Sequence, residues 1–306
     1  MPIFDISKNG DFVQITEKNF LIEKDIQKIV EKNIDTIFGL KFISSEYTLN
    51  NLRIDSLCFD TETNSFVIIE YKKDRNFSVI DQGYAYLSLL LNNKAEFILL
   101  YNENNKDNRM IKKNDVDWTQ SRVIFVSPNF TNYQRKAIEF KDLPIELWEV
   151  KLYSNNTILF NQIQSPEKSE SITTISQRSE VVKQVSREVR TYDEEYHFQH
   201  ASDKTKSIYN ELKNSILFIG NDISFKSRKM YIAFVRKSPF IYINFKKFHL
   251  TIVIKMNKGS LIDPKNIARD VSDVGRKGHG YYEIKLTDAT DLGYVMTLIK
   301  QSYDKN

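Results

Sequence analysis

The stretch RIDSLCFDTETNSFVIIEYKK, residues 53–73, decides how the N-terminal half of this chain folds. It joins two apolar, β-branched and aromatic runs through the turn sequence DTETN, a pattern typical of two neighbouring strands. In a strand, residues i and i+2 share a face, so Glu70 and Lys72 are expected to point together and Tyr71 to point the other way. Pairing of the two strands across the turn is expected to bring Asp55 to the same edge.

Two carboxylates and a lysine at one sheet edge suit the hydrolysis of a phosphodiester. The reaction needs stabilised negative charge on phosphorus and an activated water, and carboxylate oxygens are good ligands for Mg²⁺. Lys72 can orient or deprotonate that water, or stabilise the developing charge. The alternative is an ordinary strand end, because Glu-x-Lys triplets occur often by chance. Glu70 ends the very apolar run FVIIE, which favours a site at the end of a core strand.

Helix and strand patterns surround this stretch. Residues 20–38 carry apolar side chains at helical spacing, with Thr16 as N-cap and Gly39 as stop signal. Strands are expected at 41–49, 95–102, 122–130 and 146–153, and helices at 77–93 and 133–140. Strands alternating with helices predict an α/β domain with a mixed sheet over residues 1–160.

The sequence changes character after residue 160. Residues 161–202 are rich in Ser, Glu, Gln and Arg, the composition of a linker or an exposed helix. Residues 203–306 have the pattern of a smaller α+β domain. Its expected helices cover 202–220, 262–274 and 289–305, and its expected strands cover 230–238, 240–247, 249–256 and 278–286.

The order RID, fourteen residues, EYK resembles the core of the PD-(D/E)XK nuclease superfamily, with Ile54 in the place of the proline. The next helix carries Gln82 and Tyr86 in QGYAY, which resembles the QxxxY element of the RecB and lambda-exonuclease-like branch. The resemblance covers about residues 17–100 and implies a restriction-endonuclease-like mixed sheet flanked by helices. It also implies that Gln82 positions Lys72 or a phosphate and that Tyr86 supports the site. The alternative is a packed Tyr86 beside an exposed Gln82.

The superfamily also places a metal-binding Glu on its first helix. Glu23 is our choice, and Glu31 lies close to the same helix face. Glu23 is also a residue that the helix dipole favours in a first turn. By this resemblance Glu23, Asp55, Glu70 and the backbone carbonyl of Tyr71 would bind Mg²⁺, with Mn²⁺ as a substitute.

Basic residues mark candidate contacts to nucleic acid. Lys73 and Arg75 lie beside the predicted site, and Arg276 and Lys277 lie in the glycine-rich segment GRKGHG, which is otherwise a flexible hairpin. Residues 220–306 hold 16 Lys and Arg against 8 Asp and Glu, in a chain whose net charge is +4. This basic region can meet a phosphate backbone or simply be a solvated surface.

The C-terminal part also resembles something: a domain of unknown function that is appended to such nuclease-like modules. The resemblance rests on GHGYYEIKL and the helix that ends in LIKQSYDKN. We expect substrate recognition or oligomerisation from it. Its strand aromatics, among them Tyr242 and Phe248, suit either nucleic-acid contact or a core, and the core is favoured.

Several classes of protein are excluded. The single Cys58 excludes internal disulfides and cysteine-rich zinc sites, and it is expected to be buried. No apolar run reaches the roughly 18 residues of a membrane span, and the N-terminus lacks a signal-peptide pattern, so a cytoplasmic protein is expected. His197 and His200 lack further ligands nearby, so no metal site is expected there.

The sequence therefore predicts a Mg²⁺-dependent deoxyribonuclease, with endonuclease action favoured over exonuclease action. Its partner would be nucleic acid, with DNA favoured over RNA; no membrane contact is expected, and a homodimer is left open. The alternative is a non-catalytic nucleic-acid-binding or protein-interaction module on a nuclease-like fold.

Overall fold

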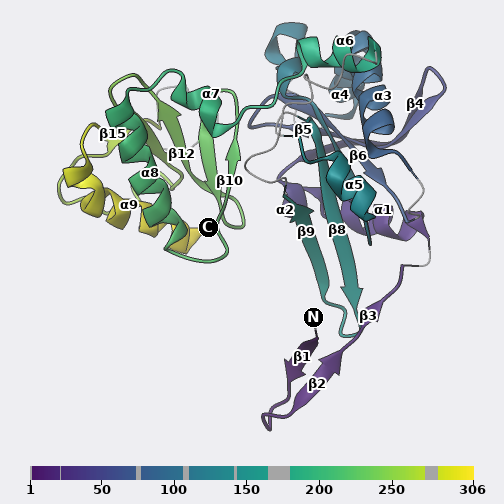
Figure 1. Ribbon diagram of the computed structural model, residues 1–306, viewed down its shortest axis with the longest axis horizontal. Helices are drawn as coiled ribbons and strands as arrows, with labels where there is room; N and C mark the ends of the chain where they lie inside the picture. The colour runs from purple at the N-terminus through teal and green to yellow at the C-terminus, as the bar shows by residue number, and fades with distance from the viewer. Residues whose placement is uncertain are drawn as a thin grey trace. The chain divides into compact units, whose positions relative to one another are not determined.

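The computed structural model describes residues 2–20, 22–73, 77–105, 110–140, 143–164, 180–272 and 282–306. Contacts divide the chain into two compact units, Met1–Thr191 and Tyr192–Asn306 (Figure 1). Within the predicted linker, helix α6 (Glu180–Glu188) packs against the core of unit 1 through Val185, whereas α7 (Glu194–Phe198) packs in unit 2 through Phe198. Among the described residues, no helix is long and apolar enough to cross a membrane.

Unit 1 is built on a seven-stranded mixed sheet of order β3-β8-β7-β6-β5-β4, with β9 paired to β8. Its strands are β3 (Glu17–Lys18), β4 (Lys41–Leu49), β5 (Leu52–Asp60), β6 (Ser65–Tyr71), β7 (Arg122–Ser127), β8 (Ile145–Tyr153) and β9 (Ile158–Ile163). β7 runs parallel to β6 and β8, and the remaining neighbours are antiparallel. Helices flank the sheet (Figure 1), so the predicted α/β class with a mixed sheet is confirmed.

Strand β6 is buried on both faces, and its successive side chains point alternately into two hydrophobic cores, one on each face of the sheet. Phe66 and Ile68 belong to the cluster formed with one set of helices, whereas Val67 and Ile69 belong to the cluster formed with the other. The first set is α3 (Val79–Asn92), α4 (Lys94–Asn104), α5 (Asn132–Ala137) and α6, and the second is α1 (Glu23–Glu31) and α2 (Ile34–Phe38). Short 3₁₀ turns cover Lys113–Asp115 and Trp118–Gln120.

The first predicted helix is two helices with a different start. Thr16 is not its N-cap, because the chain first forms β3 and α1 begins only at Glu23. The side chain of Asp25 accepts from the backbone N of Ile22 at 3.1 Å and so satisfies a free donor at the helix start. Gly39 ends α2 with φ of +66°, as a glycine stop signal should.

The strand predicted at 95–102 is wrong, since these residues lie in helix α4. Phe97 and Tyr101, four residues apart, are buried in the core, whereas Leu99 is 53% exposed. A strand would bury Phe97, Leu99 and Tyr101 on the same face. The run is apolar enough for either structure, and the spacing of its two aromatic anchors decides for the helix.

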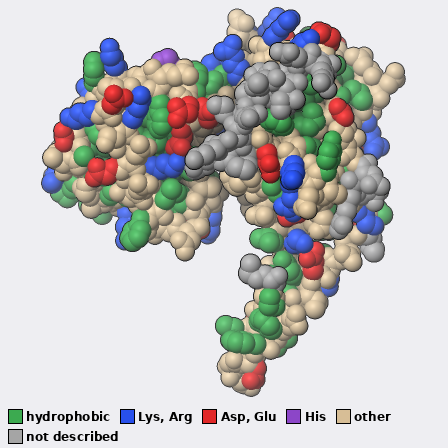
Figure 2. Space-filling view, viewed as in Figure 1, with side chains coloured by type: hydrophobic (Ala, Val, Ile, Leu, Met, Phe, Trp, Pro, Cys, Tyr) green, Lys and Arg blue, Asp and Glu red, His purple; other side chains and the backbone are tan. Residues whose placement is uncertain are grey.

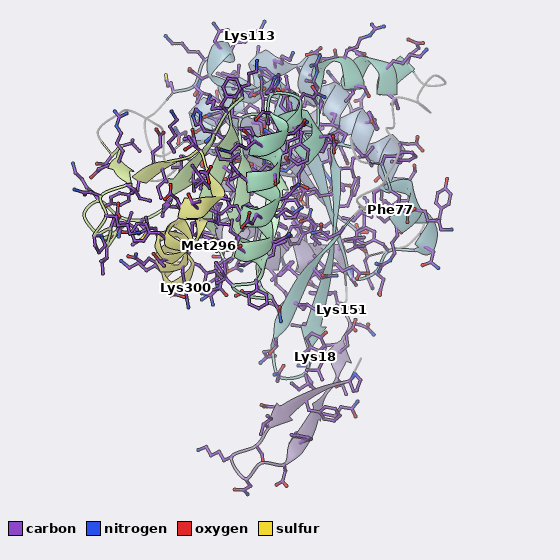
Figure 3. The ribbon with its side chains drawn as sticks, turned by 60° about the vertical axis from the view of Figure 1, so that its left-hand side comes forward. Lys18, Phe77, Lys113, Lys151, Met296 and Lys300 are labelled. Atoms are coloured by element: carbon purple, nitrogen blue, oxygen red, sulfur yellow. The ribbon has the colours of Figure 1, made fainter. Side chains whose placement is uncertain are left out.

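Unit 2 is a six-stranded antiparallel sheet of order β10-β11-β12-β13-β15-β14 with helices, as the predicted α+β pattern requires. Its strands are β10 (Ser224–Ser227), β11 (Ile232–Val235), β12 (Pro239–Phe245), β13 (Leu250–Ile254), β14 (Arg269–Asp270) and β15 (Tyr282–Leu286). Helices α8 (Asp203–Leu217) and α9 (Leu292–Lys305) pack on this sheet, and a 3₁₀ turn covers Ala289–Asp291. Figure 3 marks α9 by Met296 and Lys300.

The helix predicted at 262–274 is wrong for the residues that the structure describes there, 262–272. Asp263 accepts hydrogen bonds from the backbone N of Ala268 at 2.7 Å and from the Tyr294 hydroxyl at 2.6 Å. Asn266 has φ of +55°, which interrupts helical geometry. The side chain of Asp263 thus competes with the backbone for hydrogen bonds and holds a loop.

The aromatic side chains of unit 2 serve mainly as core. Phe234, Phe240 and Tyr242 are buried, and Phe248 is exposed in the β12–β13 turn. His197 is also buried, and its Nε2 lies 2.9 Å from the carbonyl of Arg228. Its ring stacks on Phe245, so this histidine is a core residue.

Candidate active site at the ends of β5 and β6

Asp55 and Glu70 lie next to each other on two neighbouring interior strands, because β5 and β6 are antiparallel and Ser56 pairs with Ile69. Oδ2 of Asp55 accepts a hydrogen bond from the backbone N of Tyr71 at 3.1 Å. Glu70 is only 4% exposed, although it carries a carboxyl group. The pairing therefore brings together two acidic side chains that are fifteen residues apart in sequence and that both leave bulk water.

Burial perturbs both acids. It raises the pKa of Glu70 to about 7, and the negative charge of Asp55 adds to the rise. Burial also raises the pKa of Asp55, against the hydrogen bond from Tyr71 that lowers it. One oxygen of Glu70, Oε2, is buried without a hydrogen-bond partner. Two negative charges at this buried position are therefore only partly stabilised by their surroundings, and the pair is suited to bind a positive charge.

Lys72 supplies one positive charge. Its Nζ lies 2.7 Å from Oε1 of Glu70, so the two side chains do share a face. Burial lowers the pKa of Lys72, but the hydrogen bond and the charge of Glu70 outweigh it and leave the pKa raised. Nζ also lies 5.9 Å from the centre of the Phe77 ring, which Figure 3 labels. Lys72 is therefore held as an ammonium ion.

Helix α3 brings Tyr86 and Gln82 to this region. The Tyr86 hydroxyl donates to the backbone carbonyl of Arg53 at 3.2 Å, and burial together with the charge of Glu70 raises its pKa. Gln82 lies one turn earlier on the same helix face. Its Oε1 is buried without a hydrogen-bond partner, so Gln82 is not merely an exposed polar residue.

Glu23 and Glu31, the two helix candidates, occupy different surroundings. Oε1 of Glu23 accepts from the backbone N of Lys73 at 2.9 Å, directly after the candidate lysine. The charge of Glu23 also contributes to the raised pKa of Asp55, which places it near that acid. Glu31 instead accepts from Ser56 and other neighbours inside the α1–sheet interface. Glu31 is therefore a structural residue.

Gln27 is a residue that sequence reasoning missed. It is buried on α1, and its Nε2 lies 3.2 Å from the backbone carbonyl of Asp55 and 2.8 Å from Oε1 of Glu31. With Tyr86 on the carbonyl of Arg53, Gln27 fixes the end of β5 from the other helix layer. The sequence does place a Gln one turn after Glu23 on the first helix. This spacing predicts a role for Gln27 only when the packing of α1 against β5 is known.

Strand β4 is irregular beside Asp55. Ser45 pairs with Ser56 and Tyr47 pairs with Ile54, which leaves Glu46 across from Asp55. Glu46 has φ of +52°, a left-handed conformation that costs a residue with a side chain about 1 kcal/mol. Its carboxylate forms an ion pair with Lys24. The backbone of β4 is therefore strained at the position across from the candidate acid.

A polar pocket of about 450 Å³ adjoins Asp55, and Glu70 is not among its lining residues. Its lining residues are Ile22, Glu23, Lys24, Gln27, Glu46, Arg53, Asp55, Tyr71 and Lys73. Arg53 is mostly exposed, and its NH2 group lies 3.9 Å from Oδ1 of Asp55. Arg53 thus joins Lys73 as a cation at the mouth of the site. The other predicted phosphate contacts, Arg75, Arg276 and Lys277, lie outside the described residues.

Asp55 and Glu70 have the chemistry that a divalent cation requires. Both offer hard oxygen ligands, and the Glu70 carboxyl has Lys72 and the Tyr86 hydroxyl as polar neighbours, both of which lower its pKa. Within the described residues, no three His, Cys, Asp or Glu side chains are arranged to hold a metal ion. Oε1 of Glu23 accepts from the backbone N of Lys73, and the backbone carbonyl of Tyr71 stays a predicted ligand. The described residues therefore offer two carboxylate ligands for a divalent cation, Asp55 and Glu70, and Glu23 lies close to them.

Comparison with known proteins shows the family. A Haemophilus influenzae protein described as uncharacterized is 43% identical over 302 residues, which cover 99% of both chains. This chain belongs to the same family as that protein. Residues 194–306 match a family described as Domain of unknown function (DUF5655), so the predicted resemblance of the C-terminal part is confirmed. This match covers almost all of unit 2.

Solved structures with local similarity include a repair endonuclease from Pyrococcus abyssi (18% identity, TM-score 0.23) and EndoMS in its apo form (19%, 0.25). These alignments cover 40% and 42% of this chain and 45% of each endonuclease chain. SfsA from Pyrococcus furiosus, in complex with Ca²⁺, is 11% identical over 54% of this chain and 75% of its own, with a TM-score of 0.26. Similarities this low place no constraint on the function of this chain.

Proposed function

We propose that this protein is a metal-dependent nuclease that hydrolyses phosphodiester bonds, with DNA as substrate and endonucleolytic cutting as its mode. One observation carries the proposal: Asp55 and Glu70, both with raised pKa values, meet at the end of two buried strands with Lys72 on Glu70. Buried acids beside a fixed cation are costly for the fold, and such costs are common at catalytic sites.

The two carboxylates are the residues that would hold Mg²⁺ or Mn²⁺, with Glu23 as a nearby third. A divalent cation bound there would neutralise phosphate charge and lower the pKa of a bound water. The carboxylates bind it only after they lose their protons, and the raised pKa of Glu70, about 7, therefore links cation binding to pH.

The remaining residues have roles that their contacts support. Lys72, kept protonated by Glu70, is suited to stabilise negative charge on the phosphate rather than to act as a base. Tyr86 and Gln27 hold the carbonyls of Arg53 and Asp55 and so act as positioning residues. The buried Gln82 Oε1 is an unused acceptor on the same helix face as Tyr86.

Cations at the mouth of the pocket suit a phosphate backbone. Arg53 and Lys73 line the pocket from the strand ends that carry Asp55 and Lys72. A bound strand would then run past the two acids with its phosphates held by side chains and by exposed backbone. Lys24 is engaged by Glu46 and contributes less.

The test is cleavage of supercoiled, linear and single-stranded DNA, and of RNA, in Mg²⁺ or Mn²⁺. Asp55→Asn, Glu70→Gln and Lys72→Met keep side-chain size, and each is expected to reduce the cleavage rate by at least about 100-fold. Glu96→Gln, an exposed change on α4, is the matched control and should cleave as wild type. Cutting of the supercoiled circle distinguishes endonuclease from exonuclease action.

Three results would redirect the assignment. Undiminished metal-dependent cleavage in all three variants would remove Asp55, Glu70 and Lys72 from the active site. Salt-sensitive binding of nucleic acid without cleavage under any condition would instead support a non-catalytic nucleic-acid-binding module. A stable protein partner without nucleic-acid affinity would support an interaction module.

A further inference from the structure

The N-terminal hairpin is an unusual feature of unit 1. Strands β1 (Ile3–Ile6) and β2 (Phe12–Ile15) form a two-stranded sheet of their own, which pairs with no other described strand. The hairpin extends away from the larger sheet beyond β8 and β9 (Figure 1). An isolated two-stranded hairpin is marginally stable in water at best, so this one needs a partner surface.

The strands of the hairpin are exposed along almost their whole length, and apolar side chains gather on the face that Figure 2 shows. The register places Ile6 opposite Phe12 and Phe4 opposite Gln14, and these residues share one face. Phe4, Ile6 and Phe12 on this face are 46%, 67% and 71% exposed. The other face carries Ile3, Val13 and Ile15 together with the acid Asp5. Apolar side chains gathered in this way mark an interaction surface rather than a scatter of surface residues.

The base of the hairpin is fixed to the sheet. The backbone N of Thr16 donates to Ser154 Oγ at 3.1 Å, and the backbone N of Ser154 donates to the carbonyl of Thr16 at 2.8 Å. Next to it, Lys151 pairs with Glu17 at 3.0 Å. Figure 3 labels Lys18 and Lys151 at this junction. The hairpin is therefore presented in a defined position and does not hang from a loose chain.

The outer edge of β2 is open and uncharged. Its sequence, FVQI, contains no charged residue and no proline, two features that block pairing of edge strands. The charged residues of the hairpin, Asp5, Lys8 and Asp11, lie on β1 and in the turn. Two acids and one lysine also make a poor surface for a phosphate backbone. The open edge thus favours another uncharged strand.

We infer that β2 pairs with β2 of a second copy of this chain. An antiparallel pair about a two-fold axis through Val13 would place Val13 opposite its own counterpart and Phe12 opposite Gln14 of the second copy. The result is a four-stranded sheet of order β1-β2-β2-β1. Phe4, Ile6 and Phe12 of both copies then lie on one continuous apolar face, which a single hairpin does not form. The same edge serves both copies, so the contact closes at a dimer.

The oligomeric state tests this inference, by sedimentation equilibrium of the full chain. The wild type should have twice the monomer mass, and Val13→Asp, which sets two like charges against each other, should raise the dissociation constant at least about tenfold. Deletion of residues 2–15 should give a monomer. Met110→Asp, a change at an apolar residue in unit 1 that is 75% exposed, is the control and should stay dimeric.

Cross-linking tests the register. The only native thiol, Cys58, is buried, so a disulfide between two copies would come from a cysteine placed in the hairpin. Oxidised Val13→Cys should form a covalent dimer, whereas Asn9→Cys in the turn should not, because antiparallel pairing sends the two turns to opposite ends. A monomeric wild type, or a dimer that survives both Val13→Asp and the deletion, would overturn the inference. A monomer that sediments with phosphatidylcholine vesicles through the hairpin would do so too.

Discussion

Replacing Glu70 with Gln should remove activity and, above a defined pH, should also stabilise unit 1. The pKa of Glu70 rises from its ordinary value of 4.5 to about 7 in the folded protein, chiefly through burial. Between these two values the folded chain holds a proton that the unfolded chain has released. Stability therefore falls as the pH rises through this window and levels off above about pH 8.

The difference between 4.5 and about 7 corresponds to about 3 kcal/mol of lost stability at pH 8. Gln resembles the protonated acid and keeps an oxygen for Lys72, so Glu70→Gln should recover most of this energy. At pH 4.5 the wild type is protonated, and the variant should gain nothing. For a unit of this size, the gain corresponds to a rise in melting temperature of roughly 6–12 °C.

Tryptophan fluorescence is the suitable measurement, in urea with a chelator present. The two tryptophans of the chain, Trp118 and Trp148, both lie in unit 1, so their signal follows the unfolding of the unit that holds the site. Glu96→Gln, on an exposed position of α4, should change stability by less than about 0.5 kcal/mol at every pH. A stability difference between wild type and Glu70→Gln that does not change with pH would refute the burial argument.

Further expectations concern the cation, the positioning residues and the substrate. Mg²⁺ should raise the melting temperature of the wild type but not of Asp55→Asn, and its affinity by calorimetry should fall up to tenfold per pH unit below pH 7, since Glu70 must lose its proton. An affinity unchanged between pH 5 and pH 8 would contradict this link. Tyr86→Phe and Gln27→Leu should lower kcat roughly tenfold or more with little change in KM, and an equal loss in the exposed control Glu96→Gln would argue against positioning. DNA affinity should fall with log salt, with a slope reduced by about one in Lys73→Ala; an unchanged slope would exclude Lys73 as a phosphate contact.

The central strands were predictable from sequence because their signal is local. The runs on either side of DTETN are rich in apolar, β-branched and aromatic residues and joined by a short turn, and the structure pairs Asp60 with Ser65 across that turn. The apposition of Asp55 and Glu70 follows from this pairing alone. By contrast, the contact of Gln27 with the Asp55 carbonyl links α1 to a strand 28 residues away, and no local pattern encodes it.

The errors also have physical causes. Residues 95–102 are apolar enough for a strand or a helix, and only the core that receives Phe97 and Tyr101 decides between them. At 262–272, the Asp263 side chain takes backbone hydrogen bonds that a helix would need. The N-terminal hairpin was not predicted, because its strands are four residues long and bury little within their own chain.

The clamp on β5 has a practical consequence. Gln27 and Tyr86 hold the backbone of the acid-bearing strand through an amide and a phenol, and neither group needs to carry charge to do so. The shape of the strand end is thus separated from the charge state of Asp55 and Glu70. A chemically inactive protein such as Asp55→Asn should keep an intact binding surface. It could therefore capture an uncut substrate from cell extracts and let the bound molecule be sequenced.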